Sequence, residues 1–354
     1  MATQGKRRLG VIGAGGIFRS LHQPYYQMTT RAQIVAVSDV REEAAREVAA
    51  AFGAEAYTDY RDLLARDDVD AVDICTPPKP HCEMTLAAAR AGKHVLVEKP
   101  MCRTVAEADA MIAACQEAGV VLQVAYMLRF NPTHQKLKQL LDGGVLGDVH
   151  LVYTNEIGWF PPQHPWLFVQ EESGGMLVEQ AIHTLDEWLW LYGPVVSVYA
   201  RTSQVPVGGT YPELERAVEN NATVVVNFAS GATGMLCKSW AAEVGHHGAG
   251  VVGSKGSANI SEGTLRWKTH DMSEAATFRP DVPDDDTYRT VPPEARAKRY
   301  WSYAAKGASI EHWLKCIAGE ETPTTGGAVG RAGIEIAEAA YRSAQTGQIV
   351  RLPL

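Results

Sequence analysis

The sequence is poor in the features that mark several classes of protein. Its six cysteines form no C-x-x-C pair and no ladder with zinc-ligand spacing. We interpret them as thiols in a reducing compartment, and we expect a cytoplasmic protein with no metal site. No apolar run approaches the ~18 residues that are needed to cross a bilayer.

Basic blocks and a targeting signal are also missing. The formal net charge is -8 and lysine and arginine are not clustered, whereas binding to a phosphate backbone relies on such clusters. The apolar run after the polar start is short, while a signal peptide contains roughly 7–15 apolar residues. We therefore expect no nucleic-acid partner, no membrane partner and no signal peptide.

The length of 354 residues predicts two domains, because single cores stop growing at about 250–300 residues. From Arg8 to about Ala125, short apolar runs alternate with longer helical patterns. Buried strands that alternate with helices are typical of a parallel sheet covered on both faces. We predict an α/β Rossmann domain, with a doubly wound parallel sheet, over residues 1–126.

A glycine-rich turn follows the first apolar run, with the sequence Gly13-Ala14-Gly15-Gly16-Ile17-Phe18. The glycines allow a tight turn and let backbone N–H groups approach a pyrophosphate at a helix N-terminus. Phe18 departs from the dinucleotide fingerprint, which has Gly or Ala at this position, and such a turn also occurs in purely structural roles. We predict cofactor contacts from Gly13, Gly15, Gly16 and Ile17.

An acidic residue ends the second apolar run. Asp39 lies 24 residues after Gly15, at the position where a carboxylate binds the adenosine ribose. A 2′-phosphate would be repelled there, so we expect NAD as the cofactor. Arg41, two residues on, would accommodate that phosphate, and it keeps NADP open as the alternative.

Two further strand ends carry polar and rigid residues. Thr76-Pro77 and then His81 follow the run Ala71–Cys75, and Glu98-Lys99-Pro100 follows the run His94–Val97. Ligands of open α/β sheets bind outside the carboxyl ends of the strands. We therefore predict that Thr76, Pro77, His81, Glu98 and Lys99 border the cofactor crevice.

In these features the chain resembles the Gfo/Idh/MocA oxidoreductases, named for glucose–fructose oxidoreductase, inositol dehydrogenase and a rhizopine-catabolism protein. Matching segments span nearly the whole chain. Besides those above, they are His22 and Pro24, Arg129-Phe130-Asn131-Pro132, Gly174-Gly175, His183-Thr184-Leu185-Asp186 and Ala340-Tyr341-Arg342-Ser343-Ala344.

The resemblance implies oxidation of a secondary hydroxyl of a sugar or polyol by NAD. It implies that Lys99 orients or polarises the reacting hydroxyl and that His183 takes or gives its proton. These residue types suit the chemistry, since histidine titrates near neutral pH and an ammonium stabilises a developing alkoxide. Taken alone, His183 is also compatible with a core histidine at the start of an apolar helix.

Glu179 departs from the family pattern, which usually has Asp four residues before the histidine. We expect one helix over Glu179–Leu191, on which Glu179 and His183 share a face and act together. The extra methylene of Glu changes the reach of the carboxylate. Glu179 is therefore predicted as a catalytic residue or as a substrate ligand.

The second half, residues 127–354, contains consecutive strand-like segments with few helices. This pattern favours an α+β domain with a large, mostly antiparallel open sheet covered on one face. In the family the free face commonly forms a dimer, so we expect a homodimer or homotetramer. Arg129, Trp159 and Trp166 are predicted to bind substrate, although the aromatic loop also suits an interface or core role.

Two other functions remain open at this stage. One is an NAD-dependent glycosidase, in which hydride transfer is transient and the net reaction is hydrolysis. The other is a cofactor-binding, sugar-sensing regulator without turnover, which the presence of both Lys99 and His183 disfavours. The sequence does not identify the sugar or the carbon that is oxidised.

Overall fold

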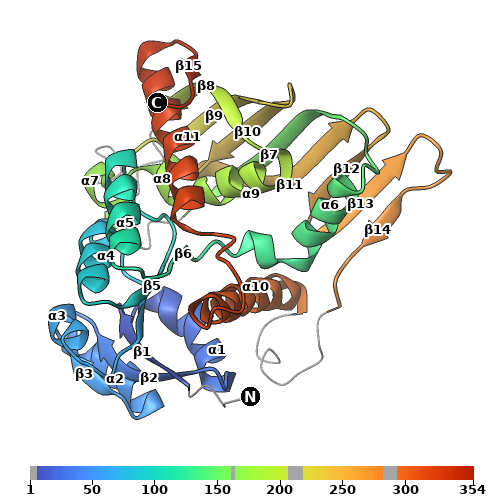
Figure 1. Cartoon of the computed structure of the whole chain (residues 1–354). Helices are drawn as coiled ribbons and strands as arrows, with labels where there is room; N and C mark the ends of the chain where they lie inside the picture. Colours follow the sequence, from blue (N-terminus) through green and yellow to red (C-terminus); the bar gives the residue numbers. More distant parts are fainter. Residues whose placement is uncertain (1–5, 161–163, 206–217, 282–292) are drawn as a thin grey trace. The chain divides into compact units, whose positions relative to one another are not determined.

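The chain forms two compact units in a computed structural model that describes residues 6–160, 164–205, 218–281 and 293–354 (Figure 1). Unit 1 contains residues 1–127 and 303–334, and unit 2 contains residues 128–302 and 335–354. None of the helices in the described ranges is long and apolar enough to cross a membrane.

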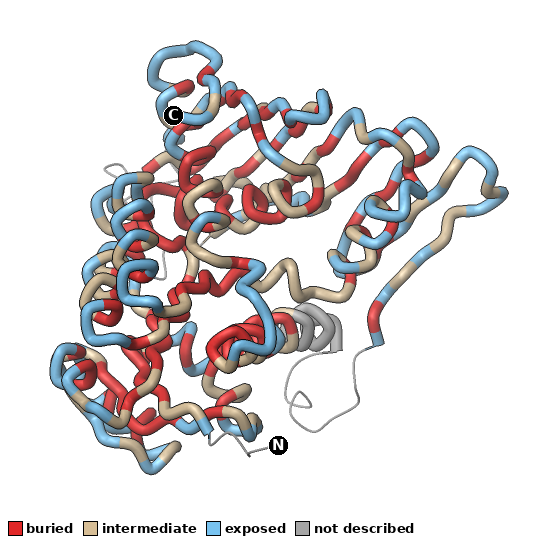
Figure 2. The backbone as a smooth tube through the Cα atoms, in the orientation of Figure 1, coloured by how far each residue is buried: buried red, intermediate tan, exposed pale blue. Residues whose placement is uncertain are grey.

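Unit 1 is built on a six-stranded parallel sheet with the strand order β3-β2-β1-β4-β5-β6. This is the order of the Rossmann fold, as the sequence predicted. Its strands are β1 (Arg7–Ile12), β2 (Ala32–Ser38), β3 (Glu55–Tyr57), β4 (Ala71–Ile74), β5 (His94–Val97) and β6 (Leu122–Val124). Most residues of these strands are buried (Figure 2), because helices cover the sheet.

The helices of unit 1 begin directly after the glycine-rich turn with a π-helical turn, η1 (Phe18–His22), which continues into α1 (Gln23–Met28). The others in the first part of the chain are α2 (Glu42–Phe52), α3 (Tyr60–Leu64), α4 (His81–Arg90) and α5 (Val105–Glu117). Single π-helical turns are rare and often occur at functional sites. Here the turn contains His22, whose side chain is fully buried.

A late segment of the chain completes unit 1. The second part of α10 (Pro293–Ile317) and the start of α11 (Gly327–Thr346) belong to this unit. Ile310, Trp313 and Leu314 of α10 lie in the same core cluster as β1 and η1 residues. The sequence prediction assigned all of 127–354 to the second domain, and the structure differs because these apolar side chains complete the first core.

Unit 2 is built on a nine-stranded sheet with the order β14-β13-β12-β11-β7-β10-β9-β8-β15. The pair β7·β10 is parallel and the other neighbouring pairs of the described strands are antiparallel, so the predicted mostly antiparallel sheet is confirmed. The strands are β7 (Val149–Trp159), β8 (Val195–Ser203), β9 (Asn221–Phe228), β10 (Thr233–Ser239), β11 (Ala241–Gly253), β12 (Gly256–Ser261), β13 (Thr264–Thr269), β14 (Ala276–Phe278) and β15 (Val350–Arg351).

Helices cover one face of this sheet. Trp188 of one helix donates a hydrogen bond from Nε1 to Thr154 Oγ1 on β7 (3.2 Å), and Ser343 of α11 accepts from the Ala200 amide on β8 (3.0 Å). The helical segments of unit 2 are η2 (Leu128–Phe130), α6 (Pro132–Asp142), η3 (Pro165–Phe168), α7 (Gln170–Ser173), α8 (Met176–Glu179), α9 (Ile182–Tyr192) and the end of α11. Alternate residues of the strands therefore point toward these helices and away from them.

The glycine-rich turn of unit 1 requires glycine at its first position. Gly13 has φ +101°, and a Cβ there would lie 2.8 Å from the carbonyl carbon and oxygen of Cys75. By contrast, a Cβ on Gly16 would meet nothing within 4 Å. The turn from β1 to η1 therefore passes directly against the end of β4.

We predict that Gly13→Ala destabilises unit 1 by about 1–3 kcal/mol, because backbone would have to move to relieve the clash and the positive φ. Gly16→Ala is the matched control and should change stability by less than about 0.5 kcal/mol. Thermal unfolding of both variants measures the difference. Equal melting temperatures for the two variants would contradict this account of the turn.

Candidate active site

Asp39 binds the glycine-rich turn from the end of β2. Its Oδ2 accepts a hydrogen bond from the Ala14 amide (2.9 Å), while Oδ1 accepts from the Arg41 amide (2.9 Å) and from Arg41 Nε (3.2 Å). Burial on its own would raise the pKa of Asp39, but the bonds from Arg41 and Ala14 outweigh it and lower the pKa. The carboxylate is therefore ionised at neutral pH.

The surface of the turn has room for a ligand beside Arg41. A Cβ on Gly15 would meet only the Arg41 guanidinium, at 4.0 Å, and Gly16 and Ile17 are exposed. The helical segment that begins there directs its first N–H groups outward, which favours an anion. The donor set fits the pyrophosphate of a dinucleotide, with the Asp39 carboxylate placed for a ribose.

The loops that follow β4 and β5 are joined by His81. This buried side chain, at the start of α4, has Nε2 2.8 Å from Thr76 O and Nδ1 2.8 Å from Pro100 O. Burial lowers the pKa of His81. Thr76 is half-buried and Pro77 is exposed, so the two predicted cofactor contacts lie at the surface of the edge and His81 lies beneath it.

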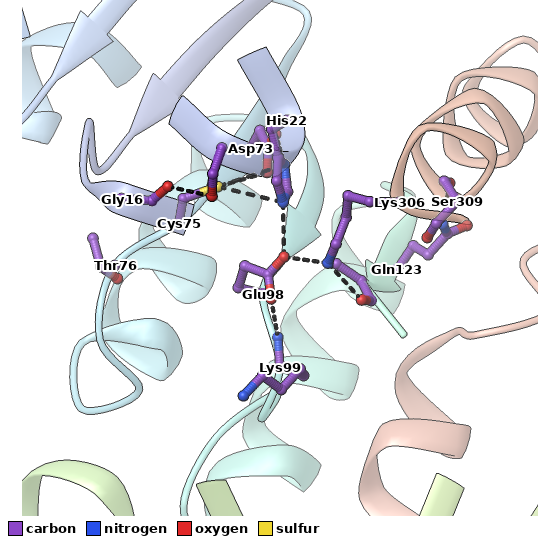
Figure 3. A network of polar contacts seen from close by, with 12 residues as sticks. Gly16, His22, Asp73, Cys75, Thr76, Glu98, Lys99, Gln123, Lys306 and Ser309 are labelled. Atoms are coloured by element: carbon purple, nitrogen blue, oxygen red, sulfur yellow. Dashed lines mark hydrogen bonds and ion pairs between the residues drawn. The ribbon is translucent and has the colours of Figure 1, made fainter. Parts of the chain in front are cut away.

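A buried ionic network lies at the same sheet edge (Figure 3). We call Asp73, His22, Glu98 and Lys306 the buried quartet. His22 Nδ1 lies 2.7 Å from Asp73 Oδ2, and His22 Nε2 lies 2.7 Å from Glu98 Oε1. Lys306 donates to the same Glu98 oxygen, so the four groups form one continuous chain of contacts.

The charges in the quartet compensate one another. Burial alone would raise the pKa of Glu98, but Lys306 and His22 outweigh it and hold the pKa well below its usual range. Burial would lower the pKa of His22, but Asp73 and Glu98 outweigh it and raise the pKa. Two carboxylates therefore face an ammonium and an imidazole that favours its charged form.

His22 and Asp73 of the quartet and the nearby Cys75 carry groups that can also bind metals. Donor atoms of His22, Asp73 and Cys75 all lie within 4.8 Å of one another, the one such cluster among the described residues. Cys75 Sγ lies 3.4 Å from Asp73 Oδ1, and Tyr26 donates its hydroxyl to Asp73 Oδ2 (2.8 Å). Because these atoms already bond to one another, we describe the cluster as part of the polar network.

The predicted single helix over Glu179–Leu191 is wrong. Glu179 is the last residue of α8 and His183 is the second residue of α9. The break arises because the Ala181 amide donates to Met176 O, five residues back, at 3.1 Å. This contact shifts the helical register by one residue, so the regular four-residue spacing on one face does not apply.

Both predicted residues nevertheless lie on neighbouring short helices of unit 2. Glu179 is buried, while His183 is half-buried with its Nδ1 atom inside. The N-terminus of α8 is held by Glu219, whose Oε1 accepts from the Leu177 amide (3.0 Å) and from the Tyr341 hydroxyl (2.6 Å). Burial raises the pKa of Glu219.

Sequence reasoning missed several residues beneath α9. Glu156 on β7 accepts from Thr184 Oγ1 and from Lys238 Nζ on β10, its register partner. Trp240 donates from Nε1 to Gln180 Oε1 at 2.5 Å. The alternating pattern of the strands indicates that Glu156 and Lys238 face the same side of the sheet. Nothing in the sequence indicates that Thr184 on α9 contacts Glu156.

The remaining predicted substrate ligands have different surroundings. Arg129 is bound to Asp186, with Nε 3.1 Å from both carboxylate oxygens and Nη2 2.6 Å from Oδ1. Trp159 is exposed, and Trp166 is half-buried with its ring stacked on His164. Residues 161–163 of the predicted aromatic loop lie outside the described residues.

Comparison with known proteins gives matches over both units. A family model described as an oxidoreductase family with an NAD-binding Rossmann fold matches residues 7–126, and the GFO/IDH/MocA C-terminal domain matches residues 134–259. A myo-inositol 2-dehydrogenase of Thermotoga maritima is 34% identical over 264 residues, covering 73% of this chain and 77% of that protein.

Two further proteins are similar over nearly the whole length. A D-apiose dehydrogenase of Paraburkholderia graminis is 31% identical, covering 99% of this chain and 91% of that protein. The crystal structure of the WlbA dehydrogenase from Bordetella pertussis, in complex with NADH and UDP-GlcNAcA, matches with a TM-score of 0.85. It is 28% identical and covers 100% of both chains. Unit 1 is therefore an NAD-binding domain.

We predict opposite effects of two substitutions on cofactor choice. Asp39→Ala removes a charged hydrogen-bond acceptor, which should weaken NAD binding roughly 10-fold or more and reduce discrimination against NADP. Arg41→Ala removes the neighbouring cation, which should weaken NADP binding more than NAD binding. Calorimetric titration of both cofactors against both variants measures this, and an unchanged preference in Asp39→Ala would show that another residue selects the cofactor.

Proposed function

Because the chain belongs to the GFO/IDH/MocA family of oxidoreductases, we propose that it transfers a hydride between a CH–OH carbon of a sugar or polyol and NAD. The observation that carries the proposal is the position of Lys99. It follows β5 at the sheet edge where the glycine-rich turn follows β1. A cation thus lies at the cofactor-binding edge of unit 1, and NADP remains the alternative cofactor.

The residues of unit 1 would hold the dinucleotide through its charged and polar groups. The amides of Gly15, Gly16 and Ile17 would bind the pyrophosphate, and Asp39 would accept hydrogen bonds from the adenosine ribose. When bound, the nicotinamide supplies the acceptor for the hydride. Thr76 would border the nicotinamide half of the crevice.

Lys99 and His183 carry the proposed proton and charge chemistry. Removal of hydride from a CH–OH carbon requires loss of the hydroxyl proton, and His183 would accept it because imidazole titrates near neutral pH. The Lys99 ammonium would stabilise the charge that develops on the oxygen. Glu179 would orient the imidazole or bind a neighbouring substrate hydroxyl, and its buried carboxylate supports such a fixed role.

Aromatic side chains are proposed to contact the substrate carbon skeleton. Trp159 and Trp166 provide faces that stack on the C–H groups of sugars. Arg129, bound to Asp186, is proposed to act by keeping its loop against α9. The names of the inositol and apiose dehydrogenases among the relatives support a polyhydroxylated substrate.

We predict NADH formation, read at 340 nm, with at least one member of a panel of hexoses, pentoses, inositols and sugar acids. Lys99→Ala and His183→Gln should each lower kcat roughly 10²-fold or more, as expected for removal of a preorganised catalytic group. Glu179→Gln should lower kcat less. Lys138→Ala, which removes a half-buried lysine on α6 that pairs with Asp142, is the control and should retain full activity. Full activity in Lys99→Ala would contradict the proposed site.

The same assay separates the alternative functions. An NAD-dependent glycosidase would release sugar from a glycoside without accumulating NADH. A regulator would bind NAD and a sugar and turn over neither. The proposal of a dehydrogenase requires stoichiometric NADH for each molecule of substrate oxidised.

We also propose that the protein is a homodimer or homotetramer that forms through the sheet of unit 2 and works in the cytoplasm. On the face opposite the helices, the strand register pairs Leu151 with Val252 and places Tyr199 and Met235 on either side of Val225. This face therefore exposes four apolar side chains on neighbouring strands. These are Leu151, Tyr199, Met235 and Val252, with exposed fractions of 37%, 38%, 41% and 39%. Exposed apolar side chains gathered on one sheet face support an interface there.

Light scattering coupled to size-exclusion chromatography tests the assembly. The wild type should elute with two or four times the 38.4 kDa mass of the chain. Met235→Lys should dissociate it at micromolar concentration, because a charge would be buried in an apolar interface. Met28→Lys, at an exposed apolar position of unit 1, is the control. A monomeric wild type would overturn the proposed assembly.

A further inference from the structure

Lys306 is an unusual residue for a helix because its charge lies in the protein interior. It belongs to α10, and only 1% of the residue is exposed. Lysine is almost never fully buried unless it is paired, since an ammonium loses its hydration there. The sequence motifs that indicate the cofactor and the reaction do not include it.

The contacts of Lys306 join the ends of two neighbouring strands. Its Nζ donates to Glu98 Oε1, directly after β5, and to the carbonyl oxygen of Ala125 (2.9 Å), directly after β6. The other oxygen of Glu98 accepts a hydrogen bond from the backbone amide of Lys99 at 3.1 Å. A short path of polar contacts therefore leads from Lys306 through Glu98 to the proposed catalytic lysine (Figure 3).

We propose that Lys306 is a positioning residue for Lys99: it holds the Glu98 carboxylate inside the protein, and Glu98 in turn fixes the backbone of Lys99. This inference rests on the proposed function of Lys99 in hydride transfer. Because Lys306 is buried, it would act on Lys99 through Glu98 and not through contact with a substrate.

The charge of Lys306 has a second consequence for the neighbouring ammonium. Glu98 precedes Lys99 in the chain, so a Glu98 carboxylate without other cations would attract the Lys99 side chain and neutralise it. Lys306 and His22 both contact Glu98 Oε1 and compensate the charge of this carboxylate. This compensation weakens the attraction of Glu98 for the Lys99 ammonium, which favours action of the ammonium on the substrate oxygen.

Stability alone does not account for this arrangement. Replacing a buried ion pair by apolar side chains of similar volume is often neutral or stabilising. An apolar pair would, however, lack the charged Glu98 oxygen that accepts a hydrogen bond from the Lys99 amide. Hydrogen bonds to a charged group are stronger than those between neutral groups. A positioning role predicts that catalysis suffers more than folding.

The test compares Lys306→Met, Glu98→Gln and the double variant in the full-length protein. Lys306→Met should lower kcat roughly 10- to 100-fold, as expected for misplacement of a catalytic group, while the Kd for NAD changes less than about twofold. The double variant should be no slower than Lys306→Met, because the neutral amide that Glu98→Gln introduces no longer attracts the Lys99 ammonium. Multiplying losses in the double variant would overturn the proposal.

A control variant separates positioning from destabilisation. Gln123 on β6 donates from Nε2 to Ser309 O on α10 (2.9 Å), so it joins the same helix to the same sheet without touching Glu98. Gln123→Leu should lower the melting temperature but retain kcat. A loss of kcat in Gln123→Leu equal to that in Lys306→Met, at matched melting temperatures, would show that Lys306 is merely structural.

Amide hydrogen exchange, followed by mass spectrometry without substrate, decides the case independently of turnover. In Lys306→Met, the amide of Lys99 should exchange at least about tenfold faster, while peptides from unit 2 keep their rates. A wild type that oxidises no substrate would refute the proposed function, whereas unchanged exchange at Lys99 would refute the positioning role.

Discussion

The need to compensate buried charge dominates the architecture of the proposed cofactor-binding edge. Asp73, His22, Glu98 and Lys306 lie inside unit 1, where an isolated charge would cost several kcal/mol. Each therefore constrains the next, and the constraint extends over β4, η1, β5 and α10. The strand ends at this proposed edge are held by this network as well as by the hydrogen bonds of the sheet.

The same network explains why a late segment of the chain belongs to the first unit. Apolar residues such as Trp313 attach α10 to the core of the Rossmann domain, and Lys306 adds a cation that pairs with the buried Glu98. In unit 2, Glu219 and Tyr341 play a comparable part for α8, because the carboxylate and the hydroxyl accept hydrogen bonds from its first turn. In each unit, proposed catalytic residues thus lie on short or terminal segments that distant side chains hold in place.

The sequence predicted the features that depend on residues close together in the chain. The glycine-rich turn, Asp39 and the strand-end position of Lys99 follow from local patterns, and the structure places all three at one sheet edge. The sequence did not predict contacts between residues that are distant in the chain, such as the contact between Lys306 and Glu98, which are 208 positions apart. The break between α8 and α9 was missed because an apolar helical pattern runs through it, while one displaced hydrogen bond at Ala181 changes the register.

The central claim is that hydride passes directly between a substrate carbon and NAD. The most direct measurement uses the best substrate of the panel, deuterated at each oxidisable carbon in turn, with NADH analysed by mass spectrometry after a single turnover. The account predicts one deuterium in the NADH from one labelled position, and none in Lys99→Ala within the same time. Oxidation of the labelled carbon with its deuterium found in water would contradict it.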